Sequence, residues 1–157
     1  MKKSFTLIEL LVVISIMLIF IGGTLVQYNT FTEQTKLKNE AKRLVDVLEL
    51  AKKKALSADL FDKTCTNFTG YKVTVALSSY SLSFGCAAVY TTVQSYNLPT
   101  NVTATVGGGN YIFTPLMNNP SFASGTITLK NANISKCVSI TVTAIGVVSL
   151  NEVLVGC

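Results

Sequence analysis

The chain has 157 residues, a formal net charge of +5 and no histidine. This length fits one small domain beside a membrane segment and excludes a long multidomain enzyme. Without histidine, and with no paired carboxylates beyond residue 64, the sequence offers no recognisable general acid, general base or activated nucleophile. We therefore expect a protein that is not an enzyme and that holds neither a cofactor nor a metal.

An apolar segment begins close to the N-terminus. Lys2-Lys3-Ser4 precedes Phe5, and residues Leu10–Val26 include neither a charge nor a proline. Together with residues 5–8 this run reaches the roughly 20 residues that a membrane-spanning helix requires. Because the lysines come first, the positive-inside rule places the N-terminus in the cytoplasm and the rest of the chain, from residue 27 on, outside.

One acidic residue, Glu9, interrupts this apolar segment. An ionisable side chain at membrane depth costs about 2.5–3.5 kcal/mol on insertion scales, so such a residue is by default functional and has a partner. An amine is the partner that we expect for Glu9.

The string Lys2-Lys3-Ser4-Phe5-Thr6-Leu7-Ile8-Glu9-Leu10-Leu11, with the apolar run to about Phe20, resembles the class III signal of type IV pilins and pseudopilins. In that family a prepilin peptidase cuts just before the phenylalanine, and the new N-terminus is methylated. The resemblance implies cleavage between Ser4 and Phe5 and N-methylation of Phe5; the family usually has glycine where this chain has Ser4. It also implies that Glu9 pairs with the N-terminal amine of a neighbouring subunit during assembly.

The same resemblance implies the partners and the location. The subunit is expected in the inner (cytoplasmic) membrane as a single-pass protein in contact with lipid, with its globular domain outside the cytoplasm. An ATPase-driven assembly platform in that membrane then moves it into a filament with other pilins. The filament is extracellular or periplasmic, as in a type IV pilus or a type II secretion pseudopilus.

Other interpretations of the N-terminal segment remain open. The run can be a Sec signal peptide with a poor cleavage site at Gly22-Gly23-Thr24, or an ordinary single-span anchor with Glu9 near the interface. Neither explains Glu9. The alternative function is a single-span, membrane-anchored extracytoplasmic binding domain that does not polymerise, and cleavage before Phe5 separates the two functions because only the filament subunit requires it.

An amphipathic helix is predicted to continue the apolar one. Its expected buried positions are spaced by four and three residues in alternation: Leu37, Ala41, Leu44, Leu48, Ala51 and Ala55. No proline occurs between Phe5 and Leu60, so the whole segment can form one helix. Gly22-Gly23 is its weak point, because each glycine costs about 1 kcal/mol relative to alanine.

The composition changes after Thr64, where charged residues become rare and β-branched and aromatic residues alternate with serine, threonine and asparagine. This pattern predicts an antiparallel β domain. The expected strands are a hairpin over residues 71–77 and 80–84, followed by 88–96, 111–114, 126–129, 137–143 and 147–155. Turns are expected at residues 97–99, 107–110, 118–120 and 145–146.

These segments predict an α+β fold, in which one long helix packs on a small antiparallel sheet. The expected organisation is a leader peptide at residues 1–4, a transmembrane and filament-core helix at 5–26, an amphipathic continuation at 27–62 and a disulfide-stabilised β-rich domain at 63–157.

All four cysteines lie in the exported part, where an oxidising compartment lets them pair. Three connectivities are possible. We favour Cys65 with Cys86 and Cys137 with Cys157, because each bond closes a loop of about 20 residues and contributes on the order of 3 kcal/mol. Free buried thiols are the alternative, and zinc is disfavoured because the chain lacks a C-x-x-C pair and histidine.

A weaker resemblance covers part of the exported region. Residues 51–56, and the segments Gly125–Leu129 and Val138–Val148, are similar to the helix end and the late strands of GspH/FimT-type minor pilins. The arginines that some of these proteins carry after the turn glycine, associated with DNA binding, are absent after Gly146. The basic run Lys52-Lys53-Lys54 points in three directions around the helix, so no strong nucleic-acid binding is expected.

Overall fold

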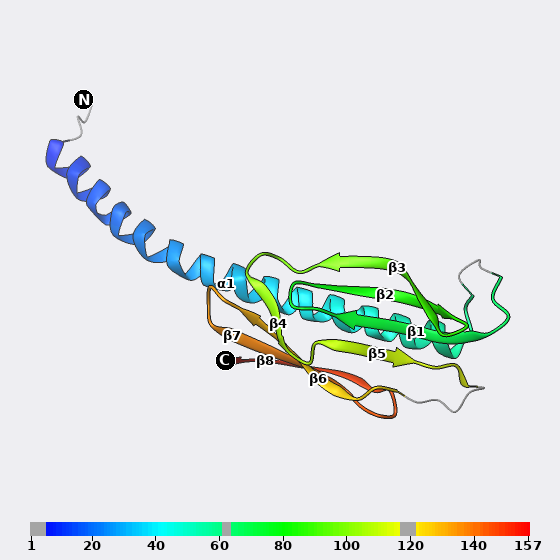
Figure 1. Cartoon of the computed structure of the whole chain (residues 1–157). Helices are drawn as coiled ribbons and strands as arrows, with labels where there is room; N and C mark the ends of the chain where they lie inside the picture. Colours follow the sequence, from blue (N-terminus) through cyan, green and yellow to red (C-terminus); the bar gives the residue numbers. More distant parts are fainter. Residues whose placement is uncertain (1–5, 61–63, 117–121) are drawn as a thin grey trace.

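The computed structural model describes residues 6–60, 64–116 and 122–157, and within these it describes residues 20–26 by their helical backbone alone. One long helix precedes eight strands, in the order α1 (Leu7–Leu56), β1 (Phe68–Val75), β2 (Ser79–Cys86), β3 (Val89–Asn97), β4 (Val102–Val106), β5 (Gly109–Phe113), β6 (Gly125–Asn131), β7 (Lys136–Val142) and β8 (Val148–Gly156). Figure 1 shows the first half of α1 extending away from the strands, while its second half lies along them. The predicted α+β class is confirmed.

Helix α1 is continuous through Gly22 and Gly23 but ends earlier than the predicted boundary at residue 62. After Leu56 the backbone of Ala58 turns into the left-handed region with φ 50°. The amide of Asp59 then donates to the carbonyl of Lys54 at 3.0 Å. This bond spans five residues, as at a Schellman-type helix end, and it stops α1 by satisfying its last carbonyls. Residues 61–63 of the predicted continuation lie outside the described residues.

The strands form two sheets rather than the single small sheet predicted. One has the order β3-β2-β1-β5 and the other the order β4-β6-β7-β8, and all of their pairings are antiparallel. The predicted hairpin is β1 with β2, in which Val73 pairs with Leu82. Strand β4 was not predicted, and β5 begins at Gly109, inside the expected turn. The pairs β1–β5 and β4–β6 join strands that are not neighbours in the sequence.

The core lies between the second half of α1 and both sheets. The six helix positions expected to be buried, Leu37, Ala41, Leu44, Leu48, Ala51 and Ala55, are all 0 % exposed. They pack with Tyr71 and Val73 of β1, and with Leu129 of β6 and Ile140 of β7, in one hydrophobic cluster. The predicted helical face is therefore confirmed.

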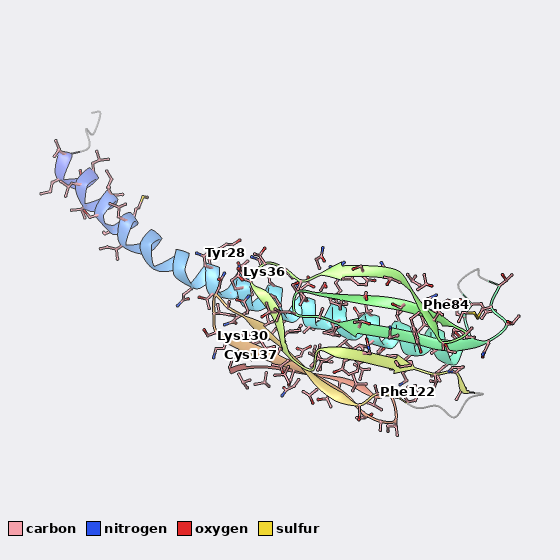
Figure 2. The ribbon with its side chains drawn as sticks, in the orientation of Figure 1. Tyr28, Lys36, Phe84, Phe122, Lys130 and Cys137 are labelled. Atoms are coloured by element: carbon pink, nitrogen blue, oxygen red, sulfur yellow. A yellow bond between two sulfur atoms is a disulfide. The ribbon has the colours of Figure 1, made fainter. Side chains whose placement is uncertain are left out.

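Two disulfides tie the ends of these strands. Cys65 is bonded to Cys86 at the end of β2, and Cys137 of β7 is bonded to Cys157, directly after β8. These are the two pairs favoured from the sequence. Cys137 lies at the end of the β domain where α1 leaves it, together with Tyr28, Lys36 and Lys130, whereas Phe84 and Phe122 lie at the opposite end (Figure 2). We call the first of these the exit end of the domain.

Candidate functional site

The first half of α1 lies apart from the β domain (Figure 1), and its residues 7–19 are apolar except for Glu9 and Ser15. Large aliphatic side chains between residues 7 and 19 are between 44 % and 82 % exposed: Leu7, Ile8, Leu10, Leu11, Val12, Val13, Ile14, Ile16, Met17, Leu18 and Ile19. A helix that is hydrophobic all round is stable only when something apolar surrounds it. This segment therefore requires a partner from outside the chain.

Among the residues described in the ranges 6–60, 64–116 and 122–157, no helical run has the length and hydropathy that a membrane crossing needs. The predicted span at residues 5–26 includes Phe5 and the side chains of residues 20–26, which lie outside the described part.

Glu9 is the only ionisable residue of the sequence between Lys3 and Glu33 apart from Tyr28, and the structure places it in the first turn of α1. Its Oε2 atom accepts two hydrogen bonds from Thr6, one from the backbone amide at 3.0 Å and one from the hydroxyl at 2.9 Å. In return the Glu9 amide donates to the Thr6 hydroxyl oxygen at 3.4 Å. These three bonds form a capping box at the start of the helix.

The capping box leaves the Glu9 carboxylate able to bind an amine. A carboxylate has about four acceptor positions, and Thr6 uses two of them. An ammonium group has three donors and no acceptor, so it complements the positions that remain. The sequence signal for the contact between Thr6 and Glu9 is the capping pattern Thr6-x-x-Glu9. Ser4 and Phe5, the predicted cleavage residues, lie outside the described residues.

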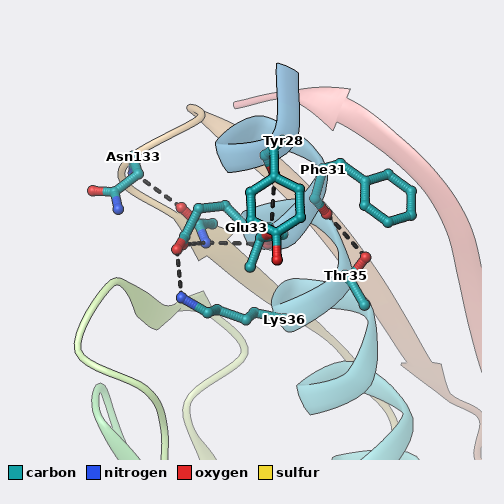
Figure 3. Close-up of polar contacts among 8 residues, drawn as sticks. Tyr28, Phe31, Glu33, Thr35, Lys36 and Asn133 are labelled. Atoms are coloured by element: carbon teal, nitrogen blue, oxygen red, sulfur yellow. Dashed lines mark hydrogen bonds and ion pairs between the residues drawn. The ribbon is translucent and has the colours of Figure 1, made fainter. Parts of the chain in front are cut away.

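A second polar cluster joins α1 to the β domain where the helix leaves it (Figure 3). Asn131, at the end of β6, is 0 % exposed, and its side-chain amide donates to Glu33 Oε2 at 2.8 Å. Its oxygen accepts from the backbone amide of Asn133 at 2.9 Å, and Lys36 donates to Glu33 Oε1 at 2.6 Å. This cluster was not predicted, because residues 33 and 131 share no local pattern.

The charge on Glu33 is stabilised by these contacts. The hydrogen bond from Asn131, and after it the hydrogen bond from Lys36, lower the pKa of Glu33 below its ordinary value of 4.5. Hydrogen bonds to a carboxylate favour its charged form, so Glu33 remains an anion at neutral pH. The cluster fixes the β6–β7 turn, residues 132–135, against α1.

The basic run Lys52-Lys53-Lys54 lies near the far end of α1, where two of its members make local ion pairs. Lys53 approaches Glu49 at 3.6 Å, and Lys54 pairs with Asp59. The three residues therefore do not present a single cationic surface. Of the three lysines that follow residue 64, Lys130 and Lys136 flank the β6–β7 turn, while Lys72 lies over the ring of Tyr90 in the other sheet.

The exposed apolar helix, with its single carboxylate, coincides with a known motif. Residues 1–25 match the prokaryotic N-terminal methylation motif. This motif is the class III prepilin signal, and it is consistent with type IV pilins and pseudopilins. The match supports a pilin-like protein that is processed by prepilin peptidase. Neither the comparison with curated proteins nor the comparison with solved structures gave a match.

Proposed function

We propose that the chain is a structural subunit of a type IV pilus or of a type II secretion-like pseudopilus. Prepilin peptidase removes residues 1–4, Phe5 is N-methylated, and residues 5–26 hold the protein in the inner membrane until assembly. The observation that carries this proposal is an apolar helix exposed on all sides, within the matched prepilin signal, whose only charged side chain is Glu9.

The exposed half of α1 explains why such a subunit polymerises. A helix can leave the bilayer only if its apolar surface is buried elsewhere, since exposing that surface to water costs about 25 cal/mol per Å². A central bundle of like helices provides this burial. In the same bundle the Glu9 carboxylate meets the methylated amine of a neighbouring subunit, which removes an unpaired charge from an apolar environment.

The proposed role is structural and not catalytic, with neither cofactor nor metal. The ionisable side chains of the β domain are few, and acidic residues of α1 such as Glu33 and Glu49 already have partners, Asn131 and Lys53 respectively. Catalysis by acids, bases or nucleophiles requires such groups to converge on a substrate.

The abundance of this chain in purified filaments distinguishes two kinds of subunit. A large amount would make it a shaft subunit, and a trace amount would make it a minor one.

Intact-mass measurement of the native protein tests the proposal. The expected mass is that of residues 5–157 with two disulfides and one added methyl group. A protein that retains Met1, or that begins near Leu25, would contradict the filament function and favour an anchored binding domain or a Sec-processed one. The matched control is a Phe5→Ala variant, which changes the residue that follows the predicted cleavage site and leaves Glu9 unchanged.

A further inference from the structure

Two aromatic side chains stand on α1 directly after the charge-free run. Tyr28 and Phe31 are each 69 % exposed, and a spacing of three residues puts them on neighbouring sides of the helix. Tyr28 follows Val26, the last residue of that run, by two residues, or about 3 Å of helix. Tyrosine, whose ring has one apolar and one polar end, concentrates at the headgroup level of membranes, and phenylalanine is common on the apolar face of helices that lie at this boundary.

The β domain reaches down to the same level of the helix. Asn133 and Ile134 of the β6–β7 turn line, with Tyr28, Asn29 and Lys36, a shallow hollow of about 370 Å³. The hydrogen bond from Asn131 to Glu33 holds the turn in this position. Along the axis of α1, the β6–β7 turn therefore lies level with Tyr28 and Asn29, which follow the proposed membrane segment.

This turn is flanked by positive charge. Lys130 is the residue before Asn131 in β6, and Lys136 is the first residue of β7, where it pairs with Asn131. The side-chain carboxylate of Glu33 already binds Lys36 at 2.6 Å. The exit end therefore presents the aromatic rings of Tyr28 and Phe31 together with two lysines, Lys130 and Lys136, whose positive charges can bind anionic groups.

We propose that, before assembly, the exit end docks on the anionic phospholipid headgroups of the outer leaflet of the membrane that holds α1. Tyr28 and Phe31 enter the boundary between headgroups and acyl chains, and Lys130 and Lys136 bind headgroup phosphates. This inference rests on the proposed function, because it requires residues 5–26 to lie in the bilayer. A second copy is the less suitable occupant, because two exit ends placed face to face bring like charges together.

The sequence contains no tryptophan, so one introduced tryptophan reports its own surroundings. We would reconstitute the full chain with Tyr28→Trp in vesicles of equal parts phosphatidylglycerol and phosphatidylcholine, with lipids brominated at different depths of the acyl chain. Quenching should be strongest for bromine near the headgroup. The control is Leu116→Trp, which is similarly exposed but follows β5 at the end of the domain that carries Phe122.

The lysines are tested with Asn133→Trp and a phospholipid that carries a nitroxide on its headgroup. Quenching should occur in vesicles that contain phosphatidylglycerol and fall in phosphatidylcholine alone or at high salt. Each basic residue near an anionic surface contributes about a fivefold factor, so Lys130→Ser with Lys136→Ser should shift docking by on the order of 20-fold. Lys72→Ser with Lys53→Ser is the matched control and should leave the quenching unchanged.

The outcomes separate the two proposals. If the chain does not float with vesicles, membrane residence fails, and the proposed function fails with it. If the chain floats, the docking inference alone is overturned by either of two results. In one, the Tyr28→Trp protein is quenched no more than the Leu116→Trp protein; in the other, quenching of the Asn133→Trp protein is indifferent to phosphatidylglycerol. The docking inference would also be overturned if the fluorescence of the Tyr28→Trp protein changed only in assembled filaments. That result would mean that Tyr28 and Phe31 contact a neighbouring subunit instead of lipid.

Discussion

The two halves of α1 are rich in the same aliphatic residues, yet only the second half is buried within its own chain. Leu44 and Leu48 are 0 % exposed, whereas Leu11 is 58 % and Leu18 is 65 % exposed. The second half packs on two sheets, and the first half extends beyond them (Figure 1). The surroundings of each half, rather than its content of aliphatic residues, therefore distinguish the buried half from the exposed half.

The arrangement of charges along the helix records this difference. In the second half, exposed charged residues such as Lys42 and Lys53 alternate with buried aliphatic residues at helical spacing. In the first half, Glu9 is the only charge, so the sequence there forms no charged stripe. A helix with one polar stripe is built to lie between a core and water, and a helix without one is built to be surrounded.

The largest effect is expected from removing the one charge of the first half. Glu9→Val should leave processing and membrane insertion intact, because insertion is favoured by apolar residues, but it should stop incorporation into filaments. The measurement is the amount of subunit in sheared filaments against the amount of processed subunit in membranes. Leu10→Val is the matched control, and a normal filament yield from Glu9→Val would show that apolar burial alone drives assembly.

The same substitution in the two halves should separate their surroundings directly. Leu44→Ala removes a fully buried side chain and should lower the free energy of unfolding of the domain by about 2–5 kcal/mol. Leu11→Ala, in the exposed half, should change it by less than about 0.5 kcal/mol. Urea unfolding of the full chain in detergent, followed by near-ultraviolet circular dichroism, measures both. Equal losses would mean that the first half packs on the domain.

The disulfides should stabilise only the half of the molecule that has a core. Replacing Cys137 and Cys157 together by alanine should lower the free energy of unfolding by about 3 kcal/mol, because the bond closes a loop with a sequence separation of 20. Replacing Cys65 and Cys86 should have a similar effect, because their separation is 21. Membrane insertion of the first half should not change. Non-reducing peptide mapping provides the control, and four alkylatable thiols in native protein would refute both bonds.

The smallest effect concerns Glu33, at the junction of the two halves. Hydrogen bonds from Asn131 and Lys36 lower the pKa of Glu33 in the folded state below its ordinary value of 4.5. The contribution of Glu33 to stability is therefore complete above that ordinary value and is lost as the pH falls through the folded-state pKa. The difference in unfolding free energy between wild type and Glu33→Gln should therefore be greatest at neutral pH and vanish in strong acid. Glu49→Gln, in an exposed pair with Lys53, is the control. A difference that does not vary with pH would show that the Glu33 contact does not depend on charge.

Those parts of the fold that depend on local spacing were predictable from the sequence. The alternation of four and three residues from Leu37 to Ala55 identified the buried face of α1, and the short turn near Ser78 identified the β1–β2 hairpin. The end of α1 was placed too late, because Ala58 adopts a positive φ that alanine does not signal. Glycine is the usual residue at such a helix end.

Long-range pairing explains the other differences. Strand β4 has only five residues and a small Ala104 at its centre, and its partner β6 follows after β5. The division into two sheets depends on pairs of this kind, which leave no mark in either strand alone. In the candidate site, Glu9 was found because its motif is local. The contact of Glu33 with Asn131 was not found, because it joins residues 98 positions apart.

For the proposed filament subunit, the capping box of Thr6 and Glu9 bears on the speed of assembly. A free glutamate samples many rotamers, and fixing one on association costs about 1 kcal/mol of entropy. Two hydrogen bonds from Thr6 hold the carboxylate in one orientation within the isolated subunit. Much of that ordering is therefore complete before any encounter, so the amine that we propose as the partner of Glu9 would meet a carboxylate whose geometry is already set.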